Sequence, residues 1–297
     1  MNYRKNIYRL GLMIGLVFLG CRAYAQELEK ASIQDRYKNG EKIHILVVPG
    51  HDNQFPGAKY KTNYEEDMNL ALAEQVADYL RKDLQIEVVV TRNVNGYMSS
   101  LYEYFQTQTL KINDFIKSHS LAMKKEIKAG SIIVPKQVPH ATASKVPMYR
   151  LYALNKWANE NKYDLIIHVH FDDEGDRVRD VAGKFSGYSV YVPDSNLLQA
   201  DISKSFGLAI AKRLNRDFNR STQPYEHAHA DSNGIIPDMK LIAMGANKTT
   251  AIPRVLIEYA YIYEPGVDPK HFPMTSDVMA AATAYGVEDF LKQDSGK

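Results

Sequence analysis

The chain has 297 residues, a formal net charge of +2, 45% hydrophobic residues and 24% charged residues. This composition is that of a globular protein with a full core, and the length fits one large domain or two small ones. No long block of Lys and Arg is present, so we predict no nucleic-acid partner. The single cysteine, Cys21, excludes an intrachain disulfide and a cysteine-based zinc site.

The first 25 residues have the features of an export signal. Basic residues precede a short apolar run at residues 10–20, and Ala23-Tyr24-Ala25 fits the small-residue rule for cleavage. The run is too short to span a bilayer as a mature helix, so we predict a periplasmic or extracellular protein with no membrane span. Cys21 follows Phe18-Leu19-Gly20, which resembles a lipobox, so lipidation of Cys21 is the alternative to cleavage after Ala25.

Residues 26–41 are polar and predict a surface lead-in, and residues 42–292 then read as one domain. Apolar, β-branched runs predict strands at 43–48, 87–91, 164–171, 187–192 and 254–259. Apolar residues at helical spacing predict helices at 66–82, 148–161, 195–219 and 274–292. The first strand, helix and second strand form a βαβ unit, which crosses over right-handed into a parallel sheet. We therefore predict an α/β fold, a single domain with a mostly parallel twisted sheet flanked by helices.

Residues 97–145 interrupt the alternation of strands and helices. Between residues 99 and 129 there is no Gly or Pro, and the spacing of the apolar residues predicts one or two helices. Prolines then punctuate the remainder. We expect a helical insertion near 97–145, lying over the edge of the sheet.

Two candidate site residues flank the loop after the first strand. Val47-Val48 ends in the breakers Pro49-Gly50, and His51 follows. In open α/β folds, ligands bind at this carboxyl edge of the sheet. Glu65 lies at the start of the next helix, where the helix dipole favours a carboxylate. Taken alone, Glu65 could equally be an ordinary helix-terminal charge.

Two later strands carry the other candidates. Alternation places His168 and His170 on one face of their strand, either as ligands or as hydrogen-bonded structural residues. Glu258 ends an apolar strand, where a carboxylate is costly unless it is paired with an Arg or binds a metal. Burial also raises the pKa of a carboxyl group, which suits proton transfer. Two imidazoles and a carboxylate are a common ligand set of catalytic zinc sites, and a further Glu supplies the base.

In their order and spacing, these motifs resemble the zinc-dependent N-acetylmuramoyl-L-alanine amidase family. The resemblance covers residues 42–292, apart from the insertion. The motifs are Pro49-Gly50-His51, Pro56-Gly57-Ala58, Glu65-Glu66-Asp67-Met68-Asn69-Leu70, Thr91-Arg92, Ile167-His168-Val169-His170 and Val255-Leu256-Ile257-Glu258.

The resemblance implies zinc bound by His51, Glu65 and His168, with Glu258 as the catalytic acid and base. It implies hydrolysis of the amide bond between N-acetylmuramic acid and L-alanine in peptidoglycan. Against the family pattern, Ile166 stands in place of a Ser and His170 in place of an Asn. Two alternatives therefore stay open: a zinc amidohydrolase acting on another N-acyl amino acid or peptide, and a non-catalytic cell-envelope binding protein.

The resemblance also suggests a role for the insertion. Some members of the family carry a helical insert that blocks the site until a partner moves it, so the 97–145 segment is either a lid for an activator protein or a stabilising surface excursion. His227 and His229 lie in a polar segment, as solvated residues or as part of the cleft lining. We expect Arg92 and Arg150 to form structural ion pairs.

Overall fold

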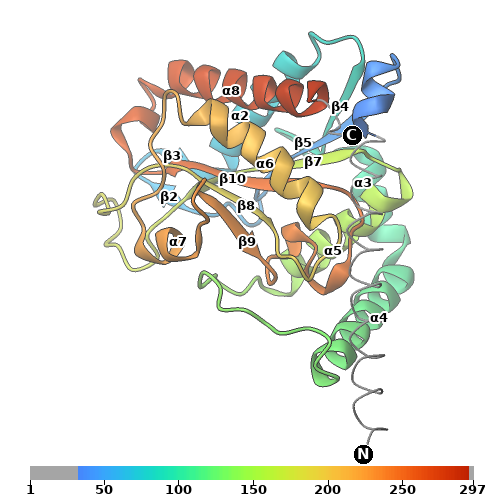
Figure 1. Cartoon of the computed structure of the whole chain (residues 1–297). Coiled ribbons are helices and arrows are strands. Elements are labelled where there is room, and N and C mark those ends of the chain that lie inside the picture. Colours follow the sequence, from blue (N-terminus) through green and yellow to red (C-terminus); the bar gives the residue numbers. More distant parts are fainter. Residues whose placement is uncertain (1–32, 294–297) are drawn as a thin grey trace, which may run out of the picture.

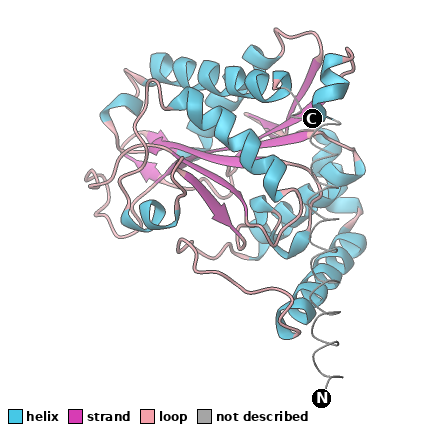
Figure 2. Cartoon of the chain, viewed as in Figure 1, coloured by secondary structure: helices cyan, strands magenta, loops and turns pink. Residues whose placement is uncertain are grey.

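The computed structural model describes residues 33–293, and a six-stranded sheet forms its centre (Figures 1 and 2). The predicted signal at 1–25, with Cys21, lies outside the described residues. The strands are, in spatial order, β4 (Ile86–Val90), β1 (Ile43–Pro49), β7 (Leu165–Asp172), β10 (Arg254–Tyr261), β8 (Ser189–Pro193) and β9 (Ile235–Asp238). All neighbours pair in parallel except β10 and β8, so β8 and β9 run opposite to the others. The predicted single α/β domain with a mostly parallel sheet is confirmed.

Three helices cover the first face of the sheet: α2 (Glu65–Leu80), α6 (Ala200–Leu214) and α8 (Phe272–Lys292) (Figure 1). Their apolar stripes meet Val47, Ile167 and Val255 in the largest core cluster. Because both faces of the central strands are covered, these strands are apolar throughout rather than alternating.

The second face is covered by α3 (Ser99–Thr107) and α5 (Lys145–Glu160), and α4 (Thr109–Lys128) packs outside α5. Leu101 of α3 and Trp157 of α5 are buried with Leu46 and Ile166 of the sheet. Two short hairpins, β2 (Lys59–Tyr60) with β3 (Asn63–Tyr64) and β5 (Arg92–Asn93) with β6 (Gly96–Tyr97), lie in the loops after β1 and β4. Short helices complete the fold: α7 (Pro224–His229), η1 (Ile242–Met244), η2 (Ala246–Lys248) and η3 (Pro265–Val267).

The insertion contains the predicted helices but lies over a face of the sheet. After α4 the chain continues as a strap, residues 129–144, which returns to α5. Val138 of the strap is buried with Tyr191 and Leu256, and His140 Nε2 lies 2.9 Å from Asp238 Oδ2. The insertion therefore covers the second face, and our expectation that it lies over the edge was wrong.

Other predicted elements differ at their ends. The helix predicted at 195–219 spans only Ala200–Leu214, because Gln199 adopts a left-handed backbone with φ 61° and so precedes the first helical turn. The lead-in is not wholly at the surface, since residues 33–38 are helical and Ile33 and Tyr37 are buried in the core. Within the described residues, no helix has both the length and the apolar character needed to cross a membrane.

Candidate metal centre

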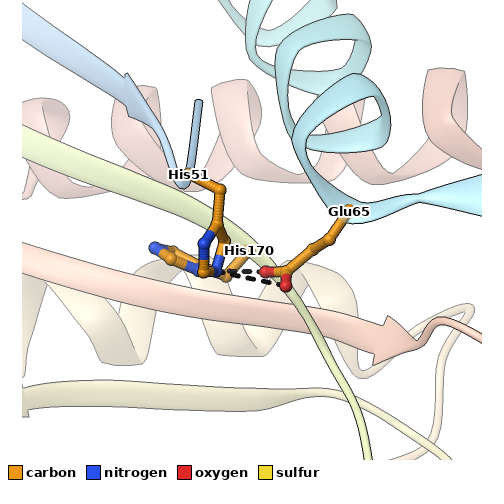
Figure 3. Close-up of side chains that lie close together, drawn as sticks. All are labelled: His51, Glu65 and His170. Carbon is orange, nitrogen blue, oxygen red and sulfur yellow. Dashed lines mark hydrogen bonds and ion pairs between the residues drawn. The ribbon is translucent and has the colours of Figure 1, made fainter. Parts of the chain in front are cut away.

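Three side chains from separate elements converge at the carboxyl edge of the sheet: His51, Glu65 and His170 (Figure 3). One donor atom from each lies within 4.8 Å of the others. His51 Nε2 is 3.1 Å from Glu65 Oε2, and His170 Nδ1 is 3.2 Å from Glu65 Oε1. The carboxylate therefore lies between the two imidazoles.

Local backbone geometry brings the two imidazoles together. His51 is the second residue after β1 and has φ 62°, a left-handed conformation that is uncommon for a residue with a side chain. Its Nδ1 lies 3.2 Å from the carbonyl oxygen of Phe55, which leaves Nε2 to face Glu65. Gly50 leaves room for the neighbouring ring, because a β-carbon there would lie 2.1 Å from His170 Cε1.

Glu65 is the first residue of α2 and is only 4% exposed. Its Oε2 accepts a hydrogen bond from the backbone N–H of Ala58 at 2.9 Å, and its Oε1 accepts one from Asn69 Nδ2 at 3.3 Å. Asn69 also donates to the carbonyl oxygen of Gly50 at 3.1 Å. The Asn of the sequence motif therefore fixes the carboxylate relative to the end of β1.

Burial and the interactions among the three side chains shift their pKa values in opposite directions. Burial alone would raise the pKa of Glu65, but hydrogen bonds from His170 and His51 hold that pKa well below its usual range. Burial likewise lowers the pKa of His51, yet Glu65 outweighs it and the net pKa of His51 is raised. For His170, burial dominates and lowers the pKa despite Glu65. An ionised carboxylate thus lies between two imidazoles, one of which favours the neutral form that binds metals.

The donor set fits a zinc ion. Two donor atoms about 2.0–2.1 Å from one tetrahedral ion lie roughly 3.3 Å apart. In this structure each imidazole nitrogen lies beside a different oxygen of Glu65, at 3.1 and 3.2 Å, and one donor atom from each of the three residues lies within 4.8 Å of the others. A carboxylate and two imidazoles also leave one position of a tetrahedral site free, as in catalytic zinc centres.

His170, rather than the predicted ligand His168, lies beside His51 and Glu65. In the parallel pairing of β1 with β7, His168 is level with Val48, and the N–H of Gly50 bonds to the carbonyl of Val169. The two histidines share a face, but His168 lies one repeat deeper in the sheet, below the edge where His51 projects. Sequence alternation could not distinguish them, because it gives the face of a strand and not the register with its neighbour.

His168 occupies a different environment. It is 1% exposed, and neither ring nitrogen has a hydrogen-bond partner among the described residues. Burial, with smaller contributions from the charges of His170 and Arg254, lowers its pKa to about 3, so the ring is neutral.

Glu258 lies next to the three-residue cluster on β10. It is the register partner of His170 on one side and of Ser189 on the other. Burial is the main cause that raises its pKa well above the usual range, and the charges of Asp172 and Glu65 add to it. Its Oε2 has no hydrogen-bond partner in the described chain. Glu258 therefore favours its protonated form in this environment and has no Arg partner among the residues described.

The remaining sequence candidates have mostly structural contacts. Arg92 donates to the carbonyl oxygens of Gly50 and Glu66 at 2.9 and 2.7 Å, so its partners are carbonyls rather than an acid. Arg150 forms the predicted ion pair, with Asp52 at 2.6 Å. His229 Nδ1 lies 2.7 Å from the carbonyl oxygen of Tyr225.

Sequence reasoning missed the buried acids beyond Glu258. Asp172 follows His170 on β7, and burial together with the charge of Glu226 raises its pKa to about 7. Glu226 is 2% exposed and accepts a hydrogen bond from the Tyr191 hydroxyl at 2.5 Å. Glu226 comes from the short helix α7, within a polar segment whose sequence gives no signal of burial.

Two hollows flank the cluster. The β1 pocket, about 490 Å³, is bounded by the end of β1 and its loop, by the strap and by α5. It is lined by Val48, Pro49, Gly50, His51, Asp52, Gln54, Phe55, Pro56, Gly57, Tyr97, Ala141, Thr142, Ala143, Pro147, Arg150, Leu151, Leu154, His168 and His170. The α7 hollow, about 650 Å³, lies beside β8 and is lined by residues that include Ser189, Arg220, Glu226, His227 and Asp231.

Comparisons with known proteins agree with the motifs. A family model described as N-acetylmuramoyl-L-alanine amidase matches residues 45–289. The N-acetylmuramoyl-L-alanine amidase AmiC of Escherichia coli is 24% identical over 222 residues, which cover 74% of this chain and 46% of AmiC. The chain thus spans about half the length of this curated relative.

Solved structures show the same fold. An N-acetylmuramoyl-L-alanine amidase from Clostridium difficile has a TM-score of 0.52 at 17% identity, over 86% of this chain and 99% of that one. The CwlD amidase from Clostridioides difficile, solved in complex with the GerS lipoprotein, has a TM-score of 0.53 at 15% identity, over 84% of this chain and 98% of that one.

Proposed function

Because the chain belongs to the N-acetylmuramoyl-L-alanine amidase family, we propose that it is a zinc-dependent hydrolase that cleaves the amide bond between N-acetylmuramic acid and L-alanine in peptidoglycan. The observation that carries this proposal is the convergence of His51, Glu65 and His170 beside the half-buried acid Glu258. In line with the activity of such a protein, we propose that it is exported to the periplasm or beyond.

The residues that would hold the ion are His51, Glu65 and His170, with His170 replacing His168 in the ligand set inferred from the sequence. When bound, a zinc ion would supply Lewis-acid chemistry there, by activating a water molecule and polarising a carbonyl oxygen. The protein's part is to fix the ligands. Hydrogen bonds from Ala58 and Asn69 to Glu65, and the contact between His51 and the Phe55 carbonyl, hold the donor atoms in place.

Glu258 is the proton carrier in this proposal. Its carboxyl group takes a proton from the attacking water and later delivers it to the nitrogen of the leaving amine. Its raised pKa favours the protonated form that donates in the second step, whereas the first step requires the ionised carboxylate. Glu258 needs no Arg partner for this role.

The alternatives from the sequence are less well supported. A binding protein on this scaffold would not need a candidate set of metal ligands with an acid beside it, and the grouping of His51, Glu65 and His170 next to Glu258 therefore favours the enzyme. An amidohydrolase for another N-acyl compound would use the same four residues and differ in the pockets. An activator protein that acts on the 97–145 insertion stays a prediction, motivated by the lipoprotein complex of the related CwlD amidase.

Product analysis with a chelator tests the proposal. Purified protein is incubated with peptidoglycan, and mass spectrometry identifies the released fragments. We expect free L-alanyl peptides from the parent protein, none after chelation and recovery on addition of zinc. Glu258→Gln serves as the matched control and should keep one zinc per chain while losing turnover by orders of magnitude. Release of peptides in the presence of chelator, or full activity of Glu258→Gln, would contradict the mechanism.

A further inference from the structure

The β1 pocket and the α7 hollow lie on opposite sides of the proton carrier. Glu258 pairs in register with Ser189, which lines the α7 hollow, and the charge of Glu226 in that hollow contributes to the raised pKa of Glu258. The β1 pocket is lined by His51 and His170 but by no described residue of β8, β9 or β10. The acid therefore lies on the α7 side of the candidate ligands.

This arrangement determines the orientation in which the substrate binds. The leaving nitrogen must lie next to the carboxyl group that protonates it, which places the amine half of the scissile bond toward Glu258 and the α7 hollow. The carbonyl carbon lies between the ligands and Glu258. The acyl half then extends away from Glu258, toward the β1 pocket.

The chemistry of the β1 pocket suits an uncharged group with an amide. Its walls include Val48, Phe55 and Leu154, and its one cationic side chain, Arg150, is already paired with Asp52. His168 is among the lining residues, and both of its ring nitrogens are buried and unpartnered among the described residues. A buried polar group without a partner is costly, and a ligand that supplies one removes that cost.

An acetamido group matches this requirement. A neutral imidazole carries one N–H donor and one acceptor nitrogen, and an acetamido group can pair with one of them, through its carbonyl oxygen or its N–H. The acetyl methyl group and the faces of a sugar ring also suit the apolar walls. The α7 hollow, with Arg220, Glu226 and Asp231, is more polar and suits a charged peptide.

We propose that the β1 pocket binds the N-acetylmuramoyl half of the substrate and that His168 is a specificity-determining residue that hydrogen-bonds its acetamido group. This inference rests on the proposed function, but it concerns binding and is tested without turnover. It also gives a role to the histidine that the candidate metal centre does not use.

The test measures how the two products bind separately to the zinc-loaded full chain. Isothermal titration calorimetry gives Kd values for N-acetylmuramic acid and for the dipeptide L-Ala-D-Glu. We expect His168→Phe to weaken N-acetylmuramic acid binding at least tenfold and to leave dipeptide binding and zinc content unchanged. Phe keeps the ring volume and removes both buried nitrogens, so the thermal midpoint should be equal or higher.

Two further variants complete the test. Ala143→Trp fills the β1 pocket from the strap and should weaken N-acetylmuramic acid binding as well. His227→Phe in the α7 hollow is the matched control and should leave N-acetylmuramic acid binding unchanged. The inference is overturned if the parent protein fails to bind N-acetylmuramic acid, or if His168→Phe binds it normally. Normal binding by Ala143→Trp would likewise exclude the β1 pocket as the binding site. Loss of peptidoglycan cleavage with normal product binding would refute the proposed function and leave this inference standing.

Discussion

The ring of His170 occupies the space into which a side chain on Gly50 would project. A β-carbon on Gly50 would lie 2.1 Å from Cε1 and 2.3 Å from Nε2 of that ring, far inside van der Waals contact. The glycine that ends the first strand motif is thus a packing requirement of the candidate metal centre.

Gly50→Ala should therefore displace His170 and reduce zinc content and turnover together. We expect less than a tenth of the parent turnover, measured alongside zinc stoichiometry by elemental analysis. Gly175→Ala is the control, because a β-carbon there meets no atom within 4 Å, and it should behave as the parent. A fully zinc-loaded, active Gly50→Ala protein would show that the site does not need this geometry.

His170→Ala should lose stoichiometric zinc, whereas His168→Phe should keep it. The reason is the register of β7, which sets His168 level with Val48 inside the sheet, whereas His170, two residues further along, lies beside His51 and Glu65. Metal analysis of the two purified variants decides between the ligand inferred from the sequence and the one inferred from the structure. The opposite pattern of zinc loss would restore His168 as the ligand.

Asn69→Ala should weaken zinc binding through Glu65. The variant removes the buried donor that connects Glu65 to the Gly50 carbonyl. Loss of such a supporting hydrogen bond typically reduces metal affinity about 10- to 100-fold. The Gly50 carbonyl keeps its hydrogen bond from Arg92, so the lost bond costs only about 0.5–1.5 kcal/mol of stability. Competition with a zinc chelator and thermal unfolding measure the two effects. Unchanged affinity would mean that Asn69 supports only the fold.

The raised pKa of Glu264 predicts how the stability of the protein depends on pH. Burial raises its pKa above the usual value, although hydrogen bonds from the N–H groups of Tyr261 and Gly187 oppose the shift. A carboxyl group whose pKa is higher in the folded than in the unfolded protein contributes its full stability below the unfolded pKa. That contribution is lost as pH rises through the folded pKa. Glu264→Gln should therefore gain stability relative to the parent between about pH 4 and pH 7. Urea unfolding at both pH values checks this, and a constant difference would contradict it.

Much of the fold was predictable because it depends on local patterns. The apolar runs identified β1, β4, β7, β8 and β10, and the motif order identified the amidase family. The sequence could not give the register between strands, which decides that His170 and not His168 meets His51. It also gave no sign of β9, whose short run Ile235–Asp238 contains Pro237, or of the burial of Glu226, which depends on tyrosines from two distant strands.

Because β8 and β9 run opposite to the other strands, the two sides of the candidate site are built from different parts of the chain. The metal side is built where β1 and β7 end, but the side facing Ser189 is built where β8 and β9 begin. The segment that leads into β9, residues 218–234, carries none of the three candidate ligands, so its length or charge can change without altering that set. A chain arranged in this way can acquire a new preference for the amine half of its substrate while its hydrolytic chemistry stays fixed.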